Sequence, residues 1–266
     1  MVNMLIAAAI AAAPPAAVQP AAPAAPAMFM VRDADTTVYL FGTFHALDGN
    51  THWFSPTIRT AFDNSNELVL ETLVPEGPGP AIVGKPGLPV RAPSVTPSAS
   101  FLATTRMAIN AGQSQGMQVA NGADMVLRHI AEAEGKPVAE LETLEFQLNM
   151  FNSMPPSAAA RPVRAGDPAG PAPMQSLSRT MSTMESAWKS GNQAVFVHML
   201  DQLRVSSPET YRMMFTERNA RWADWIAARM RTPGTVFVAI GAGHLAGKDS
   251  VLVRLAEKGL PSSRVE

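Results

Sequence analysis

Two apolar, β-rich runs lie near opposite ends of this chain, at residues 36–41 and 235–240, with helical patterns over much of the sequence between them. A further strand-like run at 28–31 precedes the run at 36–41. Another apolar run covers 67–71 and ends with a glutamate. Strands interspersed with helices favour a layered α/β domain. We therefore expect a central mixed sheet flanked by helices, with a large helical excursion between the first and last strands.

The composition indicates one folded domain and excludes several classes of function. Of the 266 residues, 47% are hydrophobic and only 16% are charged, which excludes global disorder. The net charge of −1 and the scattered basic residues argue against a nucleic-acid partner. The absence of cysteine excludes disulfides and thiolate chemistry. We expect a single domain over 28–266, with Pro/Gly-rich insertions near 75–99 and 154–174.

The first 27 residues differ from the rest of the chain. An apolar run of about ten residues precedes an Ala/Pro-rich tract, and such a run is too short to span a bilayer. It is typical of a secretory signal followed by a spacer, although no positive charge precedes it. We expect an exported protein, periplasmic or extracellular, with no transmembrane helix in the mature chain. A disordered Ala/Pro tail is the alternative interpretation.

A Gly-x-x-His motif follows each of the two β-rich runs. The motifs are Gly42 to His45 and Gly241 to His244, and Glu71 leaves the third apolar run. Ligands gather at the carboxyl ends of strands in open α/β sheets, and glycine there permits close approach to the backbone. Two histidines and one carboxylate form an accepted ligand set for a catalytic divalent metal. On spacing alone, each histidine is equally consistent with a hydrogen-bonded role in a tight turn.

Several blocks of the sequence resemble the TraB/GumN family, to which the Tiki-type proteases are distantly related. Residues 38–45 and 67–71 resemble the opening block of that family, and 235–247 resemble its last strand and Gly-x-x-His motif. Glu217-Arg218-Asn219 with Trp222 is similar to the family's Glu-Arg-Asn block. Supporting matches lie at 140–143 with Gln147 and at 188–192, where Asn192 stands in place of the family's aspartate.

The resemblance implies an α/β domain whose active centre contains His45, Glu71 and His244. In the Tiki-type relatives this centre is associated with metal-dependent peptide hydrolysis, with manganese or cobalt favoured over zinc. Arg218 and Glu142 match family blocks and are expected near the site. Arg218 is suited to bind a carboxylate or an oxyanion, or it forms a surface ion pair. Glu142 is either a site carboxylate or a helix-entry residue favoured by the helix dipole.

The sequence therefore predicts a metal-dependent hydrolase that cleaves peptide bonds, with a peptide or small molecule as substrate and the oligomeric state open. His45, Glu71 and His244 would hold the ion, and Glu71 or Glu142 would move a proton. One alternative is a metal-independent His/Glu hydrolase similar to the erythromycin esterases. Another is an exported protein that binds a ligand such as haem without turnover, and a third is a fold that has lost its activity.

Other motifs receive structural interpretations. Residues 112–116 fit the Gly-x-Ser-x-Gly pattern of serine hydrolases, but a helical pattern precedes them where a nucleophile elbow needs a strand. His52 is expected at the surface, in the loop after the first motif. His129 and His198 are expected on helices, in solvated or core-edge positions.

Overall fold

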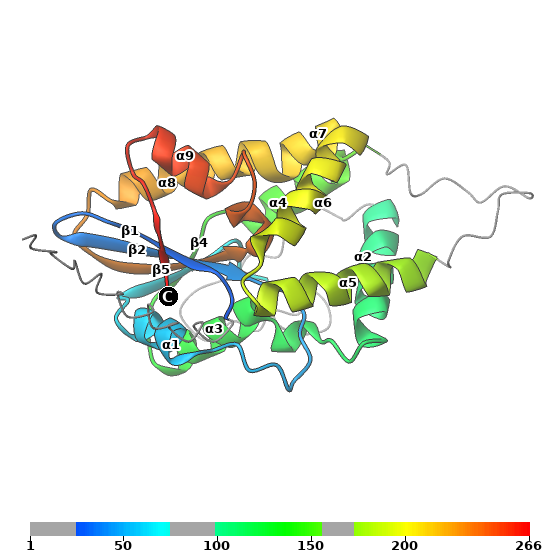
Figure 1. Cartoon of the computed structure of the whole chain (residues 1–266), viewed down its shortest axis with the longest axis horizontal. Coiled ribbons are helices and arrows are strands. Elements are labelled where there is room, and N and C mark those ends of the chain that lie inside the picture. The colour runs from blue at the N-terminus through cyan, green and yellow to red at the C-terminus, as the bar shows by residue number, and fades with distance from the viewer. Residues whose placement is uncertain (1–24, 75–98, 156–172) are drawn as a thin grey trace, which may run out of the picture.

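A six-stranded mixed sheet forms the centre of the protein, with the strand order β4-β3-β5-β2-β1-β6 (Figure 1). The computed structural model describes residues 25–74, 99–155 and 173–266. The strands are β1 Met28–Arg32, β2 Thr36–Thr43, β3 Glu67–Leu70, β4 Val138–Glu140, β5 Gly234–Gly241 and β6 Ser263–Val265. The predicted α/β class is confirmed.

Four neighbouring strands of this sheet run parallel. β2 pairs with β5, β5 with β3, and β3 with β4, all in parallel register. Their carboxyl ends therefore meet at one edge of the sheet. β1 pairs antiparallel with β2 and with β6. The sequence analysis missed β6, a three-residue edge strand with largely exposed side chains and no apolar run to mark it.

Helices cover both faces of the sheet. The helices are α1 Pro56–Asp63, α2 Ala99–Gln113, α3 Ala123–Ala133, α4 Leu144–Ser153, α5 Pro173–Lys189, α6 Gln193–Ser206, α7 Pro208–Tyr211, α8 Glu217–Arg229 and α9 Val251–Glu257. In Figure 1, α8 and α9 lie on one face of the sheet and α1 and α3 on the other. Alternate residues of β5 serve the two layers: Val238 packs with the α8–α9 side, and Phe237 with the α1–α3 side.

Local sequence signals account for the ends of several elements. The side chain of Ser55 accepts a hydrogen bond from the N–H of Ile58, so it caps α1, and Pro56 occupies the first turn. Gly135 follows α3 with a φ of 71°, the left-handed conformation that glycine adopts after a helix. Serine and proline at a helix start and glycine after a helix end are typical sequence signals, so both ends agree with the local sequence.

Two details of the structure are not visible in the sequence pattern. A π-helical segment, Arg212–Thr216, interrupts the helical stretch between α7 and α8. A π-helical turn contains one residue more than an α-helical turn, so it changes which of the following side chains face the sheet. The α-helical periodicity of the sequence does not reveal this extra residue. The strands also extend into both glycine motifs, since Thr43 belongs to β2 and pairs with Gly241 of β5.

Several predictions concern residues outside the described part of the chain. The leader and spacer at 1–27 lie mostly there, and so do the insertions near 75–99 and 154–174. At the borders, Ala99 and Pro173 begin helices inside the expected insertions. The folded part begins before Met28, because Ala27 is buried and its carbonyl accepts a hydrogen bond from Gly42. No helix among the described residues is long and apolar enough to cross a membrane.

A buried hydrogen bond joins α5 to the first glycine motif. Trp188 is 1% exposed, and its indole N–H donates to the carbonyl of Gly42 over 2.7 Å. Replacing Trp188 with Phe leaves that carbonyl buried without its partner. We expect Trp188→Phe to lower the free energy of unfolding by about 1–3 kcal/mol in chemical denaturation. Trp225→Phe on the partly buried face of α8 is the control; an equal loss in both variants would contradict the role of this bond.

Candidate functional site

Three side chains predicted from the sequence meet at the carboxyl edge of the parallel strands. His45 follows β2, Glu71 follows β3, and His244 lies in a 3₁₀ turn, Ala242–Leu245, directly after β5. A Cβ atom at Gly241 would lie 3.0 Å from Glu71 Oε1, 3.3 Å from His45 Nε2 and 3.7 Å from His244 Cδ2. The three side chains thus surround Gly241, and a larger residue there would collide with them.

His244 is held in one orientation by Asn219 of α8. The Asn219 side-chain amide donates to the carbonyl of Asp249, which turns its Oδ1 toward His244 Nδ1 at 2.6 Å. Nδ1 therefore carries the hydrogen, and Nε2 lies 3.4 Å from the Arg218 guanidinium and 3.8 Å from Glu71 Oε1. Burial is the main cause that lowers the pKa of His244 to about 3, so the ring is neutral at pH 7.

Aromatic rings fix the same imidazole from its sides. The ring centroid of Trp222 lies 4.4 Å from that of His244, and the centroid of Phe215 lies 4.9 Å away. Phe215 belongs to the π-helical segment and also packs against Gly243, where a Cβ would lie 3.2 Å from its ring. The π-helical segment thus interrupts the helical stretch where the chain packs against the second motif.

His45 is more open and has an acidic partner. Its side chain is 59% exposed, and Nδ1 lies 3.2 Å from Asp124 Oδ1 in the first turn of α3. Partial desolvation opposes protonation, but the carboxylate of Asp124 outweighs it and raises the pKa of His45 to about 9. Asp124 therefore compensates the charge of His45 and directs Nε2 toward Gly241.

Arg218 connects the two predicted carboxylates. Its guanidinium donates to Glu71 Oε2 over 3.0 Å and to Glu142 Oε2 over 2.8 Å, and Arg218 is 3% exposed. Burial opposes ionisation of Glu71, but His244, Arg218 and the other neighbours lower its pKa to about 2. The N–H of Gly241 donates to the second oxygen of Glu71. The carboxylate is thus ionised and bound through both oxygens.

The structure also resolves the alternatives left open for Arg218 and Glu142. Arg218 forms an ion pair, but a buried one rather than a surface one, and its guanidinium also approaches the carbonyl of Met214 and His244 Nε2. Glu142 is 6% exposed, and Arg221 holds its other oxygen over 3.1 Å. In the structure, both side chains are thus engaged by other residues of the protein.

The remaining sequence candidates lie outside this cluster. His52 is exposed in the loop between β2 and α1, and His129 and His198 are exposed on α3 and α6. Ser114 lies in the turn that follows α2, and its hydroxyl donates to the carbonyl of Ala111. The Gly-x-Ser-x-Gly motif therefore ends a helix, as the sequence indicates, and forms no strand-to-helix elbow.

Asp124, Asn219, Trp222 and Phe215 were not among the predicted site residues. Residues 218 and 219 each lie three or four positions from 215 and from 222, so helical periodicity around Arg218 indicates a shared face. No comparable signal exists for Asp124, because only the packing of α3 beside the first motif brings it to His45.

The chemistry of the cluster fits a divalent metal ion. Both imidazoles have an oxygen at Nδ1, from Asp124 or Asn219. Such outer partners accompany most metal-binding histidines. His45 Nε2 lies against Gly241, and His244 Nε2 lies 3.8 Å from Glu71 Oε1 and 3.4 Å from the Arg218 guanidinium. As the side chains stand, no three His, Asp or Glu residues in the described ranges are close enough to hold an ion. Binding would require them to draw together, with Glu71 shared between the ion and Arg218.

The comparisons with known proteins identify the family. The model of the TraB/PrgY/gumN family matches residues 27–78 and 81–264. The chain therefore belongs to this family, as the resemblance of its sequence blocks indicates. No curated protein and no solved structure matches the chain.

The buried ion pair of Arg218 generates a stability prediction. Arg218→Met leaves two buried carboxylates without their shared cation, so we expect a loss of about 3–5 kcal/mol in the free energy of unfolding. Arg221→Met removes the other partner of Glu142, but its side chain is 46% exposed, and we expect a loss of only about 0–1 kcal/mol. Chemical denaturation measures both; losses of equal size would contradict the assignment.

The Asn219 contact predicts the tautomer of His244. We expect ¹⁵N NMR of the wild-type protein to show His244 with its hydrogen on Nδ1 alone. Asn219→Ala removes the acceptor and should produce a mixture of tautomers. Gln202→Ala, which removes a partner of His198 on α6, should leave the His244 signals unchanged. A wild-type His244 with its hydrogen on Nε2 would contradict this geometry.

Proposed function

We propose that this member of the TraB/PrgY/gumN family is a metal-dependent hydrolase that cleaves peptide bonds. The observation that carries the proposal is the convergence of His45, Glu71 and His244 above Gly241, with both Nδ1 atoms engaged by outer partners. A divalent ion bound there, manganese or cobalt before zinc, would polarise the scissile carbonyl and lower the pKa of a bound water. The resemblance to the Tiki-type proteases supports the peptide as substrate.

The residues of the chain have separate roles in this proposal. Glu71 is better placed than Glu142 to move a proton, because its Oε1 lies 3.8 Å from His244 Nε2 and borders Gly241 together with His45 Nε2, whereas both oxygens of Glu142 are bound by arginines. Arg218 keeps Glu71 ionised and in place. Asp124 and Asn219 orient the two imidazoles. The exposed side of His45 provides the approach for a substrate.

A second candidate, a metal-independent hydrolase, is supported by a different observation. Arg218 binds Glu71 and lies 3.4 Å from His244 Nε2. Its guanidinium thus supplies a positive charge at the place where the first proposal puts the metal ion. The pKa of His45 is about 9 and that of Glu71 about 2, so the two side chains form an ionised acid–base pair near neutral pH. This arrangement suits proton transfer to an ester or amide leaving group.

Metal content and hydrolysis, measured on the same preparations, test these proposals. After incubation with Mn²⁺, Co²⁺ or Zn²⁺, we expect bound metal in the wild-type protein and none in His45→Ala or His244→Ala. Asp124→Ala should weaken the metal affinity by roughly 10–100-fold, since it removes an outer partner of a ligand. Hydrolysis of a peptide library should follow the metal content. His198→Ala on α6 is the control and should match the wild type.

The outcomes separate the two candidates. Hydrolysis that survives chelation but is lost in His45→Ala would support the metal-independent enzyme. A wild-type protein that neither binds metal nor hydrolyses peptides and esters would overturn both.

A further inference from the structure

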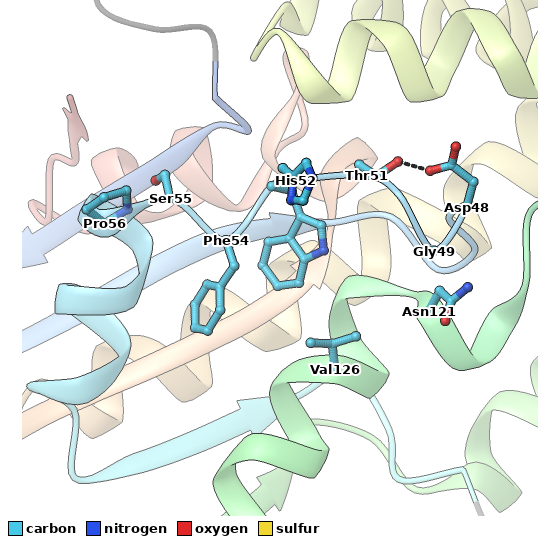
Figure 2. Close-up of a pocket in the computed structure, with 10 residues that line it drawn as sticks. Asp48, Gly49, Thr51, His52, Phe54, Ser55, Pro56, Asn121 and Val126 are labelled. Carbon is cyan, nitrogen blue, oxygen red and sulfur yellow. Dashed lines mark hydrogen bonds between the residues drawn. The ribbon is translucent and has the colours of Figure 1, made fainter.

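A groove lies beside the proposed active centre, between the loop that follows the first motif and the start of α3 (Figure 2). Its volume is about 500 Å³, within the usual range for small-ligand sites. In Figure 2, Phe54 extends from the loop, Val126 lies on α3, and Asp48 and Thr51 lie at one end. Trp53 also lines the groove. Gly49, His52, Ser55, Pro56 and Asn121 complete its lining.

The groove and the proposed active centre share a wall. Asp124, which pairs with His45, lies between Asn121 and Val126, which both line the groove. The N–H of Ala123 donates to the carbonyl of Phe44, so α3 begins directly against the first motif. A Cβ at Gly122 would lie 2.3 Å from the carbonyl oxygen of His45, which shows how closely the two segments pack.

The loop wall is tied to the same segment. Leu47 pairs with Gln118 in an antiparallel bridge, two residues after His45 and one residue before Asp48. If a peptide were held at His45, the residues next to its bound peptide group would therefore lie close to the groove.

The charge at the end of the groove is negative. Asp48 accepts a hydrogen bond from the hydroxyl of Thr51, and within the described residues no lysine, arginine or histidine forms an ion pair with it. Glu185 of α5 lies 3.3 Å from the same Thr51 hydroxyl, but its carboxylate forms an ion pair with Lys189. Asp48 is thus the carboxylate available to a ligand.

The other walls suit a hydrocarbon chain. Phe54 is partly buried and offers an aromatic surface, and Val126 faces it from α3. A groove with such apolar walls, ending at a carboxylate that has no cationic partner among the described residues, matches a long aliphatic side chain with a cationic head, because the stem packs while the charge pairs. Lysine and arginine side chains have this form.

We propose that the groove is a substrate subsite that binds a lysine or arginine side chain near the scissile bond of a peptide. The inference rests on the proposed hydrolase function for its biological meaning, but binding in the groove does not require catalysis. It assigns Asp48 as the residue that determines the preference for a basic side chain.

Binding to the full chain tests the subsite without any reaction. The probes are acetyl-Ala-Lys-Ala-amide and acetyl-Ala-norleucine-Ala-amide, which differ in the cationic head. Trp53 lines the groove, so tryptophan fluorescence and NMR shifts of groove residues report binding. We expect the lysine peptide to bind roughly tenfold more tightly than the norleucine peptide. Asp48→Asn should abolish that difference, and Asp201→Asn, an exposed carboxylate on α6, should preserve it.

A second variant blocks the groove from its opposite wall. Asn121→Arg places a guanidinium across from Asp48, and we expect it to remove lysine-peptide binding while the chain remains folded by circular dichroism. Equal affinity for the two peptides in the wild type, or an unchanged preference in Asp48→Asn, would overturn the subsite.

Hydrolysis separates this inference from the proposed function. In an active preparation, kcat/KM should favour peptides with a basic residue, and Asp48→Asn should remove that preference. A preference in binding without any turnover would support the subsite and count against the hydrolase. Turnover with no preference for basic residues would overturn the subsite and leave the hydrolase standing.

Discussion

Two segments far apart in the chain meet in the parallel pairing of β2 with β5, and the candidate site depends on the register of that pairing. Thr43 lies opposite Gly241, so the two Gly-x-x-His motifs leave the sheet side by side. A slip of one residue would turn each side chain of β5 to the other face and carry His244 away from Glu71. The bond from Trp188 to Gly42 and the close packing of Gly42 against Ala242 hold this edge in place.

Charge is balanced in two separate groups around Gly241. Glu71 and Glu142 share Arg218 in the interior, and Arg221 completes that group at the surface. His45 depends instead on Asp124. Buried ion pairs add little net stability, because desolvation offsets their attraction, but they define one arrangement of the side chains that make them. The interior group therefore positions Glu71, while the more open His45 remains accessible to a ligand.

α3 connects the candidate site to the neighbouring groove. Its first turn supplies Asp124 to His45, and the residues on either side of Asp124 form one wall of the groove. The opposite wall is the loop that begins at the first motif, so one short segment of chain determines both the approach to His45 and the unpaired carboxylate of Asp48. The same segments of backbone thus hold both the proposed catalytic residue His45 and the proposed substrate-binding groove.

The sequence by itself determined the strands at 36–41, 67–70 and 235–240, and the capped starts and glycine ends of helices such as α1 and α3, because apolar periodicity and capping act locally. It also indicated His45, Glu71 and His244 as one cluster, since parallel strands bring their carboxyl ends to one edge. Only the tertiary structure decided that Asp124 pairs with His45 and that Arg218 is buried. It also placed the π-helical segment against His244. Those features depend on contacts between residues far apart in the chain, for which local propensity carries no signal.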